Sequence, residues 1–362
     1  MSEKRYTYHD LFVHVRAAFK KMGCNEEHAT ICANVLMAAE LRGIPSHGIT
    51  RLKDYMLMWQ KGRIKTQPDI SIVHETATTA VVDADQAFGA VAGTYAMRTA
   101  IKKAQKYGTA WISVRNSSHY GIAGYYSMMA LKRDMIGISM TNANPLVAPT
   151  FSTDRLLGTN PIAVAIPAGK EDPFIADFAT TPIARGKLAL KERFNELIPE
   201  GFVQTPEGHA SNDPAIITKG GAILPLGSDY EHGSHKGYSL SSIVDIFSSV
   251  LSRANFGPFV PPQVAYLKPK DNLPGKGLGH FFGVMSIDGF QPAEEFKEYM
   301  DQWIRTFKQA RPAKGHKEIL IPGEPERRKE EDYRKNGIPV DDKIIDDLKI
   351  VYDALELQKF SL

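Results

Sequence analysis

The middle of the chain alternates between short β-branched runs and stretches with the apolar spacing of helices, and this alternation limits the possible folds. The apolar runs, bounded by Gly, Asn, Pro or Asp, are TATTAVVDAD, TAWISVRN, MIGISMTNA, PIAVAIPA and PFIADFA, and FFGVMSI is a further strand-like run. Between the first runs, AGTYAMRTAIKKAQKYG and YYSMMALKRD have helical periodicity, and a glycine ends the first of them. We therefore predict an α/β (α+β) core over residues 76–290.

Helical patterns dominate both ends of the chain. From Tyr8 to about Ala39 two helices are predicted, with Asn25 as the N-cap of the second, and GITRLKDYMLMWQKG predicts a third. Residues 1–75 are therefore an N-terminal helical subdomain. Residues 291–362 contain the amphipathic segments AEEFKEYMDQWIRTFKQA and DDKIIDDLKIVYDALEL, which we expect to pack on that subdomain. The Gly-, Pro- and His-rich residues 206–237 predict a long loop.

Composition excludes several classes of protein. The net charge of +3, from 44 basic and 41 acidic residues, leaves no basic surface for nucleic acid. No stretch approaches the roughly 18 apolar residues of a membrane span, and the charged start MSEKRYTYHD lacks a signal-peptide core, so we expect a cytoplasmic protein without membrane contact. Cys24 and Cys32 are too few for a disulfide framework or a zinc site and are predicted to be unreactive thiols.

Glycine-rich phosphate loops of the usual kinds are missing from this α/β chain. GKGLGH, at residues 275–280, precedes a strand rather than a helix, which is the wrong order for a Rossmann dinucleotide turn. The sequence also lacks a P-loop, a zinc-protease motif and a Gly-x-Ser-x-Gly motif. The polar side chains where apolar elements end are then the candidates for chemistry.

The first such cluster is Ser46, His47, Arg51 and Tyr55, in SHGITRLKDY. If a helix begins near Gly48, these side chains can face one cavity. The planar guanidinium of arginine matches a carboxylate, and a histidine beside it can donate or accept a proton. The alternative is that Ser46 merely caps the helix and Arg51 is a solvated surface residue.

Further clusters follow the predicted strands. RNSSHYGIAGYY places Ser117, Ser118, His119 and Gly121 at an expected helix start, where His119 either takes part in chemistry or only caps the helix. Asn142, Asn144 and Asn160 could hold polar ligand groups or could simply start turns before proline. The remaining candidates are Asp177, Thr180, Thr181 and Lys187 in ADFATTPIARGKL, and Lys236 at the start of a long apolar helix, where a cation favours a nearby anion.

Taken in order, seven motifs give the chain a family resemblance. RGIPSHGITRL, NSSHYGIAGYY, TNANPLVAPT, LGTNPIAVAIPAG, DFATTPIARGKL, HKGYSL and IPGEPE resemble the malate/L-lactate dehydrogenase family of NAD(P)-dependent oxidoreductases, which also contains ureidoglycolate, sulfolactate and diketogulonate dehydrogenases. The resemblance implies a non-Rossmann dinucleotide-binding fold, with a helical subdomain from both termini. It also implies a homodimer with shared active sites.

The resemblance assigns roles to individual residues. His47 and His119 are candidates for proton transfer, with His47 favoured as the direct donor, and Arg51 would hold the substrate carboxylate. Ser46, Tyr55 and Asn144 would border the substrate. The dinucleotide contacts implied by the motifs are Asp177, Phe178, Ala179, Lys236, Gly237, Gly323 and Glu324. Two departures, the missing glycine pair in APTFSTDRLLGTNP and the length of GSDYEHGSHKG, lie near the cofactor and affect NAD against NADP preference.

The expected activity is reversible hydride transfer from reduced nicotinamide to a 2-oxo acid, which yields a 2-hydroxy acid. Malate and oxaloacetate are the leading pair, NAD is the expected cofactor with NADP possible, and no metal is required. L-lactate, ureidoglycolate, sulfolactate and cyclic imino acids are alternative substrates. A metal-dependent hydrolase, given 11 histidines, and a non-enzymatic ligand-binding protein are the alternatives from other classes.

Overall fold

The computed structural model describes residues 4–357 and is built on one mixed sheet of seven strands. In spatial order the strands are β2 (Ser71–Glu75), β3 (Thr79–Asp83), β4 (Thr109–Ser117), β11 (Leu278–Ser286), β5 (Met135–Thr141), β6 (Ile162–Ile166) and β7 (Phe174–Phe178). Neighbouring strands are antiparallel except for β3 and β4, which are parallel. The predicted strands are confirmed, and β2 lies in the segment assigned to the helical subdomain.

The α-helices are α1 (Tyr8–Lys21), α2 (Glu26–Leu41), α3 (Arg51–Gln60), α4 (Gly89–Tyr107), α5 (Ala123–Met128), α6 (Arg185–Arg193), α7 (Ser234–Asp245), α8 (Ala293–Lys308), α9 (Glu324–Asn336) and α10 (Asp342–Ala354). Short 3-10 turns cover Pro45–His47, Met129–Arg133, Pro214–Ile217, Gly257–Phe259 and Ile287–Gly289, and a π turn, Ile246–Val250, extends α7. The side chain of Asn25 caps α2 by accepting the N–H of His28, as predicted. No helix within residues 4–357 is long and apolar enough to cross a membrane, and the cytoplasmic location stays a prediction.

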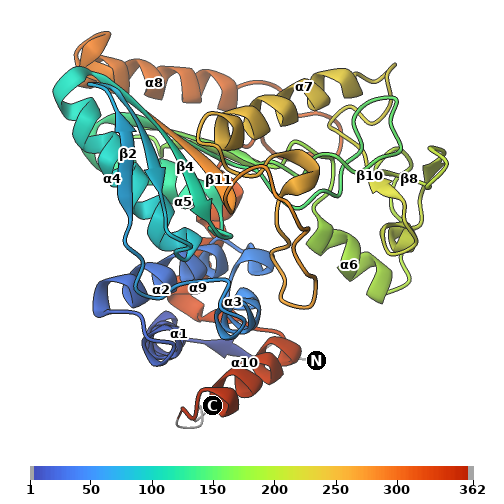
Figure 1. Cartoon of the computed structure of the whole chain (residues 1–362). Helices are drawn as coiled ribbons and strands as arrows, with labels where there is room; N and C mark the ends of the chain where they lie inside the picture. Colours follow the sequence, from blue (N-terminus) through green and yellow to red (C-terminus); the bar gives the residue numbers. More distant parts are fainter. Residues whose placement is uncertain (1–3, 358–362) are drawn as a thin grey trace.

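Helices cover both faces of the sheet. The π turn after α7 contacts β4 and β11 on one face, while α4 and α5 contact β4, β11, β5 and β6 on the other. Beyond α4 lies a layer made of α1, α2, α3, α9 and α10 (Figure 1). One continuous apolar core runs from this helical layer to the sheet.

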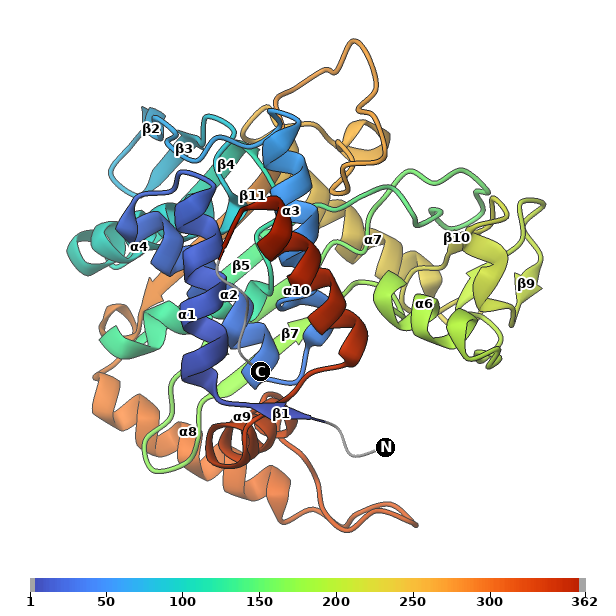
Figure 2. The same ribbon diagram turned by 90° about the horizontal axis from the view of Figure 1, so that it is seen from below.

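Both ends of the described chain contribute to the helical layer. β1 (Arg5–Tyr6) pairs with β12 (Ile338–Pro339), and α3 contacts α10 through an ion pair in which Lys53 Nζ lies 2.6 Å from Asp347 Oδ1. Figure 2 shows α1, α3 and α10 grouped on this side of the molecule. The layer that carries Arg51 is therefore assembled from segments far apart in the sequence.

A small lobe stands to one side of the sheet in both views (Figures 1 and 2). It contains α6 and a three-stranded sheet of β8 (Val203–Gln204), β9 (Ala210–Ser211) and β10 (Ala222–Ile223), with its own apolar cluster. The prediction of a plain loop over residues 206–237 was therefore incomplete. Strands of two residues are too short to produce a visible alternation of apolar and polar side chains.

The glycines of GKGLGH lead directly into β11, near the centre of the sheet. A Cβ on Gly279 would lie 2.0 Å from the carbonyl oxygen of Ser248, so this glycine lets the π turn pack against the strand. The run thus serves sheet packing, in agreement with its poor match to a Rossmann turn.

Candidate active site

The SHG motif forms a 3-10 turn before α3 and not the first turn of that helix. α3 begins at Arg51, three residues later than expected, and its N-cap is Thr50, which makes no side-chain cap. Ser46 caps nothing, because its hydroxyl lies 3.0 Å from His47 Nδ1. The capping alternative for Ser46 is therefore wrong.

Arg51 is half-buried and held in place. Its Nε donates to the carbonyl of Ser46 at 2.7 Å, and its Nη1 lies 3.5 Å from the carboxylate of Asp54. Nη2 has no partner among the residues that the structure describes. This arrangement leaves the end of the guanidinium available to a ligand and contradicts the view of Arg51 as a freely solvated side chain.

His119 lies between the end of β4 and the start of α5, so it is not at the helix N-terminus expected from the sequence. Tyr55, which is 5% exposed, places its hydroxyl 2.7 Å from His119 Nδ1, and the N–H of Gly121 points to the same nitrogen at 3.4 Å. The rings of His47 and His119 are stacked, with centroids 5.4 Å apart. Two clusters from different layers therefore meet at one place.

Both imidazoles are neutral at pH 7. Burial, with a smaller contribution from the cation of Arg51, lowers the pKa of His47 to about 4. Burial also lowers the pKa of His119 well below its usual value, and Arg51, His47 and His280 add to the effect. Because a backbone N–H can only donate, Nδ1 of neutral His119 is an acceptor and Nε2 carries the proton.

Two buried residues support these turns and were not singled out from the sequence. His280 on β11 is fully buried, lies 2.7 Å from Thr141 Oγ1 and 2.8 Å from Ser117 Oγ, and stacks on Tyr120. Glu40 in the last turn of α2 accepts the N–H of Ile49, and burial raises its pKa to about 7. Both occur in apolar stretches, and the sequence gives no sign that their polar atoms point inward.

The expected dinucleotide contacts on β7 lie at the edge of the sheet. Asp177 accepts the N–H of Gly124 at 2.8 Å. Its recessed surroundings raise its pKa to about 6 through desolvation, although the side chain keeps contact with solvent. Phe178 is 42% exposed, and Ala179 is partly exposed. The carboxylate and the aromatic ring are therefore both accessible to a ligand.

The other expected dinucleotide contacts, Lys236, Gly237 and Gly323, differ in how accessible they are to a ligand. Lys236 is exposed in the first turn of α7 and forms no ion pair within residues 4–357. A Cβ on Gly237 would lie 2.2 Å from the carbonyl oxygen of Leu226, so only glycine fits there. At the start of α9, Gly323 packs on Ile175 of β7.

Glu324 already has three partners in the protein. Its carboxylate accepts from the N–H of Ile321 at 3.1 Å, from Lys308 at 3.1 Å and from Arg328 at 2.6 Å. Burial alone would raise its pKa, but these hydrogen bonds lower it to about 2. Its contact with a cofactor stays a prediction.

The three candidate asparagines differ from one another in their surroundings. The amide of Asn142 bonds Asp245 and the backbone of Asn255 and Gly279, and that of Asn160 bonds the backbone of Ala143 and Ser241. Both are fully buried, so they connect segments of the protein and do not face a ligand. Asn144 is only partly buried, and its oxygen accepts from the N–H of Gln263 at 3.2 Å. Thr180 and Thr181 are buried and donate to backbone carbonyls.

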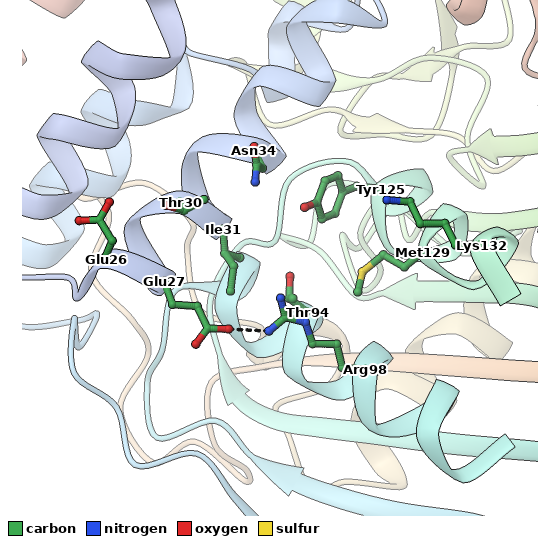
Figure 3. Close-up of a pocket in the computed structure, with 10 residues that line it drawn as sticks. All are labelled: Glu26, Glu27, Thr30, Ile31, Asn34, Thr94, Arg98, Tyr125, Met129 and Lys132. Atoms are coloured by element: carbon green, nitrogen blue, oxygen red, sulfur yellow. Dashed lines mark hydrogen bonds and ion pairs between the residues drawn. The ribbon is translucent and has the colours of Figure 1, made fainter. Parts of the chain in front are cut away.

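A separate pocket of about 590 Å³ lies between α2, α4 and α5. Figure 3 shows its rim, where Glu27 pairs with Arg98, and its lining, which includes Asn34, Thr94 and Tyr125. None of the candidate site residues lines this pocket. It is therefore distinct from the place where the two histidines meet.

Comparisons with known proteins agree with one another. A family model described as malate/L-lactate dehydrogenase matches residues 6–349. A malate dehydrogenase of Pyrococcus abyssi is 43% identical over 340 residues, 94% of this chain and 91% of that protein. An L-sulfolactate dehydrogenase of Methanocaldococcus jannaschii is 39% identical over 338 residues, 93% of each. The crystal structure of malate dehydrogenase from Entamoeba histolytica superposes with a TM-score of 0.92 at 35% identity, covering 99% of each chain.

Proposed function

We propose, since this chain belongs to the malate/L-lactate dehydrogenase family, that it reduces a 2-oxo acid to a 2-hydroxy acid with a nicotinamide dinucleotide, and catalyses the reverse reaction. The chain is a dehydrogenase acting on a CH–OH group. The observation that carries the residue assignment is the position of the Arg51 guanidinium beside two neutral imidazoles. Membership of this family argues against the two alternatives from other classes, a metal-dependent hydrolase and a non-enzymatic binding protein.

Dehydrogenases of this family use nicotinamide cofactors. The residues fit such a group, since Lys236 is exposed and has no ion pair within residues 4–357, which suits the pyrophosphate, and Phe178 is an exposed ring. We propose these residues, with Asp177, Ala179, Gly237, Gly323 and Glu324, as the contacts. When bound, the nicotinamide ring supplies or accepts the hydride. NAD is the proposed cofactor, and NADP is the alternative.

Arg51 is proposed to bind the substrate carboxylate. Its Nε donates to the Ser46 carbonyl and its Nη1 lies 3.5 Å from Asp54, so Nη2 is the nitrogen left to form a charge-assisted contact with the substrate carboxylate. This contact fixes the substrate with its keto group near the imidazoles. Asn144 and Ser46 are proposed to border the same substrate.

His119 has the contacts of a proton donor. Tyr55 and Gly121 occupy Nδ1, so the Nε2 proton points away from them and is available to the substrate oxygen. The sequence favoured His47 for this role, whereas these contacts favour His119, with His47 as a second hydrogen-bonding partner. Tyr55 is then an orienting residue for His119 in addition to its expected place at the substrate.

The protonation states suit both directions of the reaction. When a 2-hydroxy acid is oxidised, the released proton goes to Nε2 of neutral His119, which requires the tautomer with the ring proton on Nδ1, where the Tyr55 hydroxyl can accept it. In the reductive direction the bound carboxylate offsets the charge of Arg51, which is one cause of the low imidazole pKa values, and so raises them. Substrate binding therefore favours protonation of the group that must donate.

Malate and oxaloacetate are the proposed substrate pair, in line with the malate dehydrogenases among the relatives. L-Lactate, ureidoglycolate, sulfolactate and cyclic imino acids are the alternatives, and the sulfolactate dehydrogenase relative supports keeping sulfolactate among them. Discrimination between acids that differ by one methylene amounts to about 1–3 kcal/mol.

A homodimer is proposed from the surface of α7. Apolar side chains along this helix and its π turn are more than a third exposed: Tyr238, Leu240, Ile243, Ile246, Phe247, Val250 and Leu251. Apolar patches of this kind on a soluble protein usually mark an interface. A second copy of the chain would bury it.

One assay tests the proposed activity. The protein is mixed with each reduced nicotinamide and a panel of 2-oxo acids, and the loss of cofactor absorbance is followed. Turnover is expected to be fastest with oxaloacetate and NADH. No oxidation of either cofactor with any acid of the panel would contradict the proposal.

A further inference from the structure

Glu40 occupies an unfavourable position for a carboxylate. It is 2% exposed and lies next to the C-terminus of α2, where the helix dipole disfavours negative charge. No Lys, Arg or His side chain forms an ion pair with it in the part of the chain that the structure describes. Its protein hydrogen bond is the one from the N–H of Ile49, at 2.6 Å. A buried group of this kind calls for a reason.

Gly48 fits against this carboxyl group. A Cβ at residue 48 would lie 2.1 Å from Glu40 Oε1 and 2.5 Å from Glu40 Cδ. With φ −94° and ψ −141°, the backbone of Gly48 lies outside the main regions open to other residues, so conformation and space both favour glycine here. The third residue of the SHG motif is thus explained by its backbone conformation together with the close approach of Glu40.

The hydrogen bond lies one residue before Thr50, the N-cap of α3. The first N–H groups of the helix, those of Arg51 and Leu52, bond the carbonyls of Gly48 and Ile49. Glu40 reaches from the end of α2 to the N–H of Ile49, just before α3. A carboxylate is favourable there, since the start of a helix attracts negative charge.

Helix α2 also contacts the turn that follows His119. A Cβ on Gly121 would lie 2.4 Å from Val35 Cγ1, so the turn after His119 packs directly on α2 one turn before Glu40. The same helix therefore contacts the turns of both histidines. The two rings lie with their centroids 5.4 Å apart.

We propose that Glu40 is a positioning residue: it accepts the N–H of Ile49 and so fixes the turn that carries His47 and Arg51 relative to His119. This inference rests on the proposed function. Glu40 itself touches neither substrate nor cofactor in this account and acts through the peptide between Gly48 and Ile49.

Two substitutions of Glu40 separate the effect of its side-chain length from the effect of its charge. Glu40→Gln keeps the length of the side chain and an acceptor oxygen but removes the charge, whereas Glu40→Asp keeps the charge and withdraws the acceptor by one methylene. Glu40→Gln is expected to retain kcat/KM for oxaloacetate within about threefold of wild type, because its oxygen still accepts the N–H of Ile49. Glu40→Asp is expected to lose about 100-fold, the size of effect that a 1 Å misplacement produces. Binding of the dinucleotide, followed by fluorescence titration, should change in neither.

Glu27 provides the matched control. It lies at the other end of α2, is exposed and pairs with Arg98, so Glu27→Gln and Glu27→Asp should leave kcat/KM unchanged. Equal activity of Glu40→Asp and wild type, equal loss in both Glu40 variants, or loss in Glu40→Gln alone would each overturn the proposal.

A second measurement does not depend on turnover. NMR titration of the imidazoles, with the His47 signal assigned from His47→Gln, should give His47 a pKa of about 4 in the wild type and a value closer to 6.5 in Glu40→Asp, because the freed turn admits water. An unchanged His47 signal would overturn the positioning role. If wild-type protein turned over no 2-oxo acid while His47 still responded to Glu40→Asp, the proposed function would fail and the positioning inference would stand.

Discussion

The turns that carry His47 and His119 lie side by side, yet they are held in different ways. The turn of His47 belongs to the helical layer, and its backbone bonds are local except for the one to Glu40. The turn of His119 ends a strand of the sheet, and Ser118 next to it bonds both Ala87 and Gly89 at the start of α4. One turn depends on a single distant side chain and the other on the sheet and a helix.

The rings of His47 and His119 also differ in how many hydrogen-bond partners hold them. Tyr55 and Gly121 set the resting tautomer of His119. Among residues 4–357 the hydrogen-bond partner of the His47 ring is the hydroxyl of Ser46, which can donate or accept. A proton donor needs a defined tautomer more than a hydrogen-bonding neighbour does. This difference supports the proposal that His119 transfers the proton and that His47 is a hydrogen-bonding partner.

Replacing each histidine by alanine gives the largest expected effect and tests this difference directly. His119→Ala should slow single-turnover hydride transfer by about 1000-fold, within the range for loss of a general acid. His47→Ala should slow it by about 30-fold or less, since only a hydrogen bond is lost. Stopped-flow absorbance of the cofactor measures both. A slower chemical step in His47→Ala than in His119→Ala would reverse the two roles.

Arg51→Met should have the next largest effect and should act on both imidazoles. Each charged hydrogen bond contributes about 1.5–3 kcal/mol, so kcat/KM for oxaloacetate should fall by about 100-fold or more. Because Arg51 lowers the pKa of both histidines, the acidic limb of the pH profile for malate oxidation should move to higher pH. Steady-state kinetics across pH provide the measurement, with added methylguanidine as a rescue. Unchanged kinetics on oxaloacetate and pyruvate would exclude the carboxylate role.

Tyr55→Phe isolates the tautomer of His119. Loss of one hydrogen bond, about 1 kcal/mol, should lower kcat by about 5- to 10-fold while the KM for the 2-oxo acid changes little. The matched control is Tyr125→Phe, a tyrosine of α5 that lines the pocket away from the histidines. A change confined to KM would instead place the Tyr55 hydroxyl on the substrate, as the sequence suggested.

The smallest expected effect is on the free energy of unfolding and concerns His280. This residue contacts Ser117 at the end of β4, close to His119. Burial lowers its pKa to about 3, below the usual 6.5, so unfolding takes up a proton between these pH values and stability falls as pH falls. His280→Gln should make the dependence of unfolding free energy on pH shallower by about 1.4 kcal/mol per pH unit between pH 4.5 and 6. Guanidinium unfolding at several pH values measures it. Glu40 and Asp177, whose raised pKa values act in the opposite direction, contribute equally to both proteins. An identical slope in the variant would contradict this account.

The strands and most helices were predictable because their patterns are local. The runs that became β3 to β7 are bounded by turn residues, and Gly108, with φ +83°, ends α4 as its position indicated. The meeting of His47 with His119 was not predictable, since it depends on how the helical layer packs on the sheet. The periodicity of apolar residues predicts helices and strands, but it does not predict how these elements are arranged in space.

The residue types of the candidate site were predictable from the sequence. The buried residues that hold its turns in place were not. Histidine, arginine and tyrosine at junctions suggest chemistry by themselves. Glu40 follows five apolar residues of α2, and the sequence does not show that its side chain is buried. Its packing against Gly48 and its bond to the N–H of Ile49 indicate its role. The start of α3 was misplaced by three residues because the 3-10 turn at Pro45–His47 has no helical repeat to detect.

The pairing of β1 with β12, and of α3 with α10, has a consequence for biosynthesis. Arg51 and His47 leave the ribosome early, but the layer that carries them packs on residues 338–354, which are made much later. Because one apolar core joins this layer to the sheet, the site proposed around His47 and His119 should be complete only after residues 338–354 have been made.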